Sequence, residues 1–164
     1  MSINIEENLF TIRRKAGNLL SAAGLNGLFP LELTKVTDFL NYTVFVFGPT
    51  PKSTNVSGSV SKKEATILLN DKESLSRKRF TLAHEIGHII LHFSQDDEFV
   101  DYNRSYPRDL KEVQADEFAA CLLMPEEVFI REWNESKHDY TYLENYFGVS
   151  PAAVGMRAYR LGLE

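Results

Sequence analysis

The sequence predicts an α+β fold, a mainly helical single domain with a small antiparallel sheet beside one unusually apolar helix. The length of 164 residues suffices for one continuous hydrophobic core and leaves little room for a second. Apolar residues recur at the three- and four-residue spacing of helices over most of the chain. Residues 42–47 and 65–70 are instead rich in the β-branched, aromatic and aliphatic residues of strands.

The first part of the chain, residues 1–75, is expected to hold two helices and the sheet. The expected helices and strands cover residues 4–23, 31–40, 42–47 and 65–70. Gly24 ends the first helix, and Pro30 precedes the second. Residues 50–61 are rich in Ser, Gly, Pro and Lys, which predicts a loop or an irregular strand. The edge of the strand at 65–70 could bind an extended peptide, although an ordinary sheet strand is equally compatible with its sequence.

The remainder divides into a segment of candidate zinc-site helices, residues 76–133, and a C-terminal helix pair, residues 138–164. The expected helices cover residues 76–93, 108–124, 125–133, 140–147 and 151–161. Residues 94–108 are polar, acidic and aromatic, and predict a long irregular connection of the kind that often carries function. Ser150 caps the last helix and Pro151 lies in its first turn, so the final pair resembles a helix-turn-helix.

Composition excludes several classes of protein. The net charge of −5 and pI near 5.4 argue against general affinity for a phosphate backbone. Arg157 and Arg160 could contact phosphates, but we expect packing or repressor docking and no direct DNA binding. The chain has no apolar run near the roughly 20 residues that span a bilayer, and its start lacks the order of a signal peptide. We therefore expect a cytoplasmic protein with no membrane partner.

Cys121 is the only cysteine, so no internal disulfide and no thiolate cluster can form. Any metal must be bound by histidines and carboxylates. His84 and His88 lie four residues apart, a spacing that points both imidazoles from one helix face toward one ion, for which Zn²⁺ is well suited. Glu85 can act there as the general base of a zincin-type active-site helix, which predicts hydrolysis of peptide bonds.

A buried helix with merely hydrogen-bonded histidines is the alternative to a metal site. Between residues 82 and 93 the only side chains that are not apolar are three histidines and Glu85. A buried Glu85 would be a charge without an evident partner unless a cation lies nearby. This cost favours the metal site.

A catalytic zinc needs a third protein ligand and an open position. Glu112 is the best candidate, because Glu112 and Asp116 stand four residues apart on the expected helix 108–124. Their repulsion disappears if Glu112 binds zinc and Asp116 accepts the free N–H of a ligand histidine. The alternative is a solvated helix edge.

His92 continues the four-residue spacing but lies about 12 Å along the helix from His84, too far for one ion to bind both. We expect a structural or cavity-lining role for it. Gly87 costs about 1 kcal/mol relative to Ala in a helix, which suggests a close approach of backbone or substrate, or simple helix packing. An oxyanion donor is also required, and Tyr102, Tyr106 and His138 are open candidates for it.

Two segments together carry a resemblance to a known family, residues 79–92 and 112–120, with the sequences RFTLAHEIGHIILH and EVQADEFAA. With LLMP at 122–125, FGVS at 147–150 and LGL at 161–163, the chain resembles the ImmA/IrrE metallopeptidases from about residue 60 onward. The resemblance implies zinc bound by His84, His88 and Glu112, with Glu85 as catalytic base. It is closest to short, ImmA-like members, because we see no segment for a C-terminal sensor domain.

The resemblance also implies a substrate class, since members are typically endopeptidases that cut helix-turn-helix transcriptional repressors, often beside prophages or toxin–antitoxin pairs. We expect a protein substrate of this kind, a repressor or antitoxin encoded nearby. The alternative is a non-catalytic repressor-binding or toxin-like module in which zinc only holds the fold. Glu85 separates the two, because only the peptidase needs a base at that position.

Overall fold

The computed structural model describes residues 5–93, 97–102 and 109–164, and it has the predicted α+β class. The helices are α1 (Ile5–Ala22), α2 (Leu33–Phe39), α3 (Leu75–His92), α4 (Leu110–Leu123), α5 (Glu126–Glu135), α6 (Tyr140–Phe147) and α7 (Pro151–Arg160). The strands are β1 (Thr43–Phe47), β2 (Val56–Ser61), β3 (Thr66–Asn70) and β4 (Glu98–Tyr102). No helix in these ranges is long and apolar enough to cross a membrane.

The sheet is mixed, with the strand order β1-β3-β2-β4. The pairs β2/β3 and β2/β4 are antiparallel, but β1 and β3 are parallel. The prediction of a wholly antiparallel sheet is therefore wrong at one pair. Strands β1, β2 and β3 alternate in direction along the chain. Because β3 inserts between β1 and β2, β1 and β3 become parallel neighbours. Because both edges of β3 are already paired, residues 65–70 have no free edge for a peptide.

The irregular connection expected at residues 94–108 contains a strand, β4, which lies at the outer edge of the sheet beside β2. Its side chains alternate as strand geometry requires. Phe99 and Asp101 point toward α3 and are partly or wholly buried, whereas Val100 and Tyr102 are exposed on the other face. The tertiary position of β4 thus places two of its side chains over α3.

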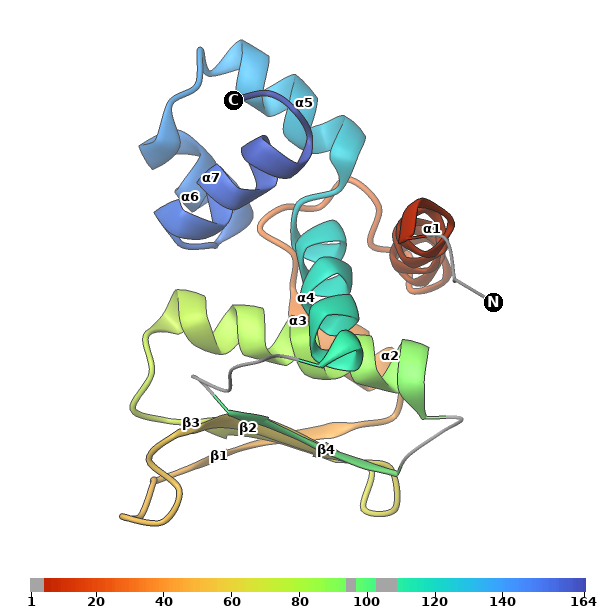
Figure 1. The fold of residues 1–164 in the computed structure, drawn as a ribbon, viewed down its shortest axis with the longest axis vertical. Coiled ribbons are helices and arrows are strands. Elements are labelled where there is room, and N and C mark those ends of the chain that lie inside the picture. Colours follow the sequence, from red (N-terminus) through yellow and green to blue (C-terminus); the bar gives the residue numbers. More distant parts are fainter. Residues whose placement is uncertain (1–4, 94–96, 103–108) are drawn as a thin grey trace.

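The helices lie in layers above the sheet (Figure 1). Helix α3 lies across one sheet face, α4 packs on α3, and α1 packs against α4. Helices α5, α6 and α7 gather at the end of the molecule away from the sheet. Fully buried side chains fill the interior between these layers, among them Leu31, Ile67, Ile86, Phe118 and Leu122.

Gly87 sets the spacing between α3 and α4. A Cβ atom at this position would lie 3.2 Å from the Cα atom and carbonyl oxygen of Ala115, and 3.3 Å from the Cβ atom of Phe118. These distances are tighter than ordinary van der Waals contact, so the close approach expected at Gly87 is one of helix packing.

The two arginines of α7 both contact other elements, Arg157 from a buried position and Arg160 from an exposed one. Arg157 is 1% exposed, and its Nε donates to the carbonyl oxygen of Met124 at 3.0 Å. Arg160 donates to Glu117, a buried carboxylate of α4, at 2.7 Å. Both side chains therefore have the packing role that we expected, and they join the C-terminal helices to α4.

Candidate metal centre

Two capped helices position the candidate ligands. The Ser74 side chain accepts a hydrogen bond from the Arg77 amide at the start of α3, and Asp109 accepts one from the Glu112 amide at the start of α4. Glu112 therefore lies in the first turn of α4, where a helix favours negative charge. His84 and His88 project from successive turns of α3 toward this turn of α4.

The side chains of His84, His88 and Glu112 converge between the helices. The Nε2 atoms of His84 and His88 are 3.1 Å apart, and each lies 3.1 Å from an oxygen of Glu112. A tetrahedral metal ion with ligand distances of about 2.0–2.1 Å would hold its ligand atoms roughly 3.3 Å apart. The spacing already present therefore fits an ion of this size. Among the described residues these three also form a group whose possible ligand atoms all lie within 4.8 Å.

Asp116 fixes the tautomer of His84. Its Oδ1 lies 2.8 Å from Nδ1 of His84, and a carboxylate can only accept, so Nδ1 carries the proton and donates it. In the neutral imidazole Nε2 then presents its lone pair to the Glu112 carboxylate. Nε2 of His84 and Oε2 of Glu112 are then two acceptors 3.1 Å apart, and they repel each other unless a cation or a proton lies between them. This orientation matches a metal ligand supported by a carboxylate behind it.

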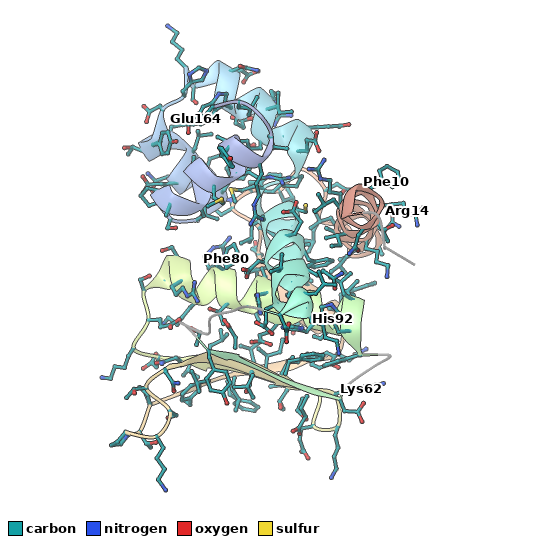
Figure 2. The ribbon with its side chains drawn as sticks, in the orientation of Figure 1. Phe10, Arg14, Lys62, Phe80, His92 and Glu164 are labelled. Atoms are coloured by element: carbon teal, nitrogen blue, oxygen red, sulfur yellow. The ribbon has the colours of Figure 1, made fainter. Side chains whose placement is uncertain are left out.

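A second chain of hydrogen bonds fixes His88. His92 Nε2 lies 2.9 Å from Oε1 of Gln114 and donates to this carbonyl oxygen. The other nitrogen of a neutral His92 then accepts from Nδ1 of His88, at 2.9 Å. His88 is left with its Nε2 lone pair directed at the centre. His92, shown in Figure 2 beside the end of α4 nearest the sheet, therefore orients His88, and its own two nitrogens are occupied by His88 and Gln114.

The charges of the centre favour a cation. Burial alone would lower the pKa of His84, but hydrogen bonds with Asp116 and Glu112 raise it to about 10. Burial would raise the pKa of Glu112, but its bonds with His84 and His88 hold that pKa well below the usual value. Burial lowers the pKa of His88 and of His92, which keeps both neutral. In the metal-free protein a proton on His84 thus lies toward Glu112, and a metal ion that replaces this proton would meet one carboxylate and two imidazole lone pairs.

Glu85 lies beside this centre and is completely buried. Neither of its oxygens has a hydrogen-bond partner among the residues that the structure describes. Burial raises the pKa of Glu85 well above its ordinary value, and the nearby Asp101 raises it further. Gly58 of β2 provides the space, because a Cβ atom there would lie only 3.2 Å from Oε1 of Glu85. An orphaned buried carboxylate next to three converging ligand atoms is consistent with a site for a cation.

Strand β4 covers the sheet side of the centre. The Phe99 ring stacks on the imidazole of His88 with 4.1 Å between centroids and 9° between planes. Asp101 is 3% exposed and forms a second group with His84 and Glu85, within 4.8 Å. Burial raises the pKa of Asp101, and Arg77 lies 3.9 Å from its carboxylate. A cleft of about 510 Å³ between α3, α4 and α7 is lined by Asp116, Phe80 and Met156, among others, and Asp116 connects it to the centre.

The three oxyanion candidates are placed differently. Tyr102 ends β4 and is 46% exposed on the sheet face opposite Asp101. Tyr106 lies outside the described residues. His138 follows α5 and stacks on Trp133 at 4.6 Å, in the C-terminal helices far from the sheet (Figure 1). The structure therefore brings neither Tyr102 nor His138 to the converging ligand atoms.

Sequence analysis did not identify Asp101, Phe99 or Gln114 as parts of this site. Gln114 had no usable signal, because residues two positions apart on a helix point to different faces, and only its hydrogen bond with His92 connects it to the site. Asp101 and Phe99 had no local signal, since only the pairing of β4 with β2 brings them to α3.

Comparison with known proteins agrees with this geometry. Residues 43–159 match the family described as the IrrE N-terminal-like domain, Peptidase_M78. A stretch of 75 residues is 39% identical to the radiation response metalloprotease IrrE of Deinococcus radiodurans, which covers 43% of this chain and 23% of that protein. The chain thus matches less than a quarter of that relative's length. A metallopeptidase-type domain with a His/Glu site for a metal ion is what the family and the structure have in common, and the chain belongs to the ImmA/IrrE family of metallopeptidases.

Proposed function

We propose that this protein is a zinc-dependent endopeptidase, with His84, His88 and Glu112 as ligands and Glu85 as general base. The observation that carries the proposal is the convergence of two imidazole nitrogens, 3.1 Å apart, on one carboxylate, with each nitrogen 3.1 Å from a different oxygen of Glu112 and with the Glu85 carboxylate nearby. Two imidazoles and one carboxylate are a ligand set that catalytic zinc prefers, and they leave one coordination position open. The bound ion would act as a Lewis acid and activate water for attack on a peptide bond.

The residues of the chain would share the remaining tasks. Asp116 and the pair His92 and Gln114 hold the two ligand imidazoles in the metal-binding tautomer. Glu85 would accept a proton from the attacking water and deliver it to the amine that leaves. The substrate that we propose is a protein, a helix-turn-helix repressor or antitoxin encoded beside this gene. The family membership and the relative's name as a metalloprotease support proteolysis.

The test is cleavage of that neighbouring repressor by the zinc-loaded protein and by Glu85→Gln. The variant should bind zinc and fold normally, because Glu85 is not a ligand, yet cleave at least about 100-fold more slowly because the base is lost. The exposed Glu127→Gln is the matched control and should cleave like the parent protein. Equal cleavage by Glu85→Gln would refute this mechanism.

One observation favours the second candidate, a non-catalytic repressor-binding module with a structural zinc. Glu85 is 0% exposed, and a base that cannot touch water or substrate cannot act. In such a module Glu85→Gln would bind the repressor as well as the parent protein does, and neither would cleave it. Co-purification of uncleaved repressor with both proteins would therefore support this second candidate.

A further inference from the structure

Strand β4 occupies a position that extended peptides take when they bind to sheets. It pairs antiparallel with the outer edge of β2, with Val60 opposite Phe99 and Ser59 opposite Val100. Main-chain hydrogen bonds of this kind bind a peptide strand irrespective of its sequence, while alternate side chains reach pockets below. Both inward side chains of β4 reach the candidate active site, since Phe99 stacks on His88 and Asp101 lies beside His84 and Glu85.

The burial of Glu85 follows from this arrangement. Gly58 of β2 lies against one side of the Glu85 carboxylate, and Asp101 of β4 lies directly opposite Gly58 in the sheet. With both strands in place no part of Glu85 contacts solvent. Asp101 of β4 is thus one of the groups that cover Glu85 on the sheet side, and β4 would have to leave the edge of β2 for a substrate strand to take its place.

We propose that the edge of β2 at residues 57–61 binds an extended segment of the protein substrate, and that β4 occupies this site in the resting protein. The substrate segment replaces β4, pairs antiparallel with β2, and places an aromatic or large apolar side chain over His88 where Phe99 now stacks. Gly58 lets the backbone of β2, and with it the paired segment, lie close to Glu85. The inference rests on the proposed peptidase function and adds the form of the substrate and the event that activates the site.

A disulfide between β2 and β4 tests the displacement. Ser59 and Val100 are directly opposite, as disulfide geometry requires, so the pair Ser59→Cys and Val100→Cys should clamp β4 in place. A second clamp uses Ser61→Cys with Glu98→Cys, whose native side chains meet at 3.3 Å. Val100→Cys alone is the control. Phosphine reduction opens the clamp without adding a thiol that competes for zinc.

Two readouts are measured on the zinc-loaded proteins, binding of a phenylalanine hydroxamate and cleavage of the neighbouring repressor. In the clamped form we expect both to fall at least tenfold, and reduction should restore them. Equal hydroxamate binding in the clamped and reduced forms, including no binding in either, overturns the inference. So does failure of both clamps to close, because β4 then does not rest on β2. Unchanged cleavage would place the substrate instead in the cleft beside Asp116.

The readouts separate this inference from the proposed function. Hydroxamate binding that depends on the clamp, without cleavage by any form, would retain the β2 site and refute the peptidase. Phe99→Ala should act in the opposite direction to the clamp, because it removes the stack on His88 and loosens β4. We expect several-fold faster cleavage than with Val100→Ala, which changes the exposed face of the same strand. Slower or equal cleavage by Phe99→Ala contradicts the inference.

Discussion

At the scale of single residues, two hydrogen bonds, from His92 to Gln114 and from His88 to His92, determine which nitrogen of His88 is available to a metal ion. Each of these bonds measures 2.9 Å, and each fixes one tautomer. Outer partners of this kind change metal affinity without contact with the ion.

Gln114→Ala should therefore weaken zinc binding by about 10- to 100-fold, because His92 loses its acceptor and no longer holds His88 in the binding tautomer. Gln114→Glu keeps an acceptor oxygen and should stay near the affinity of the parent protein. Competition with a chromogenic chelator measures both constants. Equal zinc affinity in Gln114→Ala would show that these two hydrogen bonds have no role in binding.

Residue spacing along one helix could be predicted from the sequence, and contacts between elements could not. His84, His88, Glu112 and Asp116 were found because helical geometry fixes which residues share a face, and the structure brings all four together. The interpretation of His92 as a non-ligand depended on the same geometry and agrees with the structure. Asp101 could not be found this way, because its approach to Glu85 depends on a strand pairing between distant parts of the chain.

At the scale of elements, α3 is joined to the C-terminal helices by Arg79. Its guanidinium donates to the carbonyl oxygens of Leu31, Gly148 and Phe147 at 3.0, 2.9 and 3.3 Å. Gly148 ends α6 in the left-handed conformation, with φ at 67°, and a Cβ atom there would lie 2.7 Å from Nε of Arg79. One side chain thus connects α3 to two other segments.

Arg79→Ala should lower the free energy of unfolding by about 2 kcal/mol, since three part-buried carbonyl groups lose a charged donor. Thermal denaturation should show this as a drop of roughly 4–8 °C in Tm. Lys78→Ala removes only an ion pair with the exposed Asp71 and should change stability by less than about 1 kcal/mol. Similar losses in the two variants would contradict the role given to Arg79.

Helices were more predictable than strands for a physical reason. The helical pattern is local, and α3 and α6 begin and end within a residue of the predicted bounds. Strand β4 has five residues, two of them acidic, and gains its stability from β2 and α3, which no local pattern contains. The parallel pairing of β1 with β3 likewise depends on the order of the strands in the sheet, which no local sequence pattern contains.

At the scale of the whole molecule, the metal centre couples stability to pH. In the metal-free protein the pKa of His84 rises from 6.5 to about 10. A raised pKa means that the folded state binds the proton more tightly, so this stabilisation is complete below about pH 6.5 and is lost as the pH rises toward 10. Zinc would replace the proton and remove this loss.

Metal-free protein should therefore become less stable as the pH rises from 6.5 to about 10, and zinc should raise Tm more at the alkaline end. Thermal denaturation with a chelator and with excess zinc, at matched ionic strength, measures both effects. A metal-free Tm that increases with pH over this window would contradict the charge arrangement described for His84.

The close contact at Gly87 has a consequence for the choice of ion. Gly87 lies between the two histidines of α3, and Ala115 lies between Glu112 and Asp116 of α4, so the separation of these two residues also sets the width of the coordination cage. Zinc accepts ligands at about 2.0–2.1 Å, whereas Ca²⁺ takes oxygen ligands at about 2.3–2.6 Å. Gly87 thereby fixes how closely the proposed ligands of the two helices approach, and a larger side chain at that position should increase this distance.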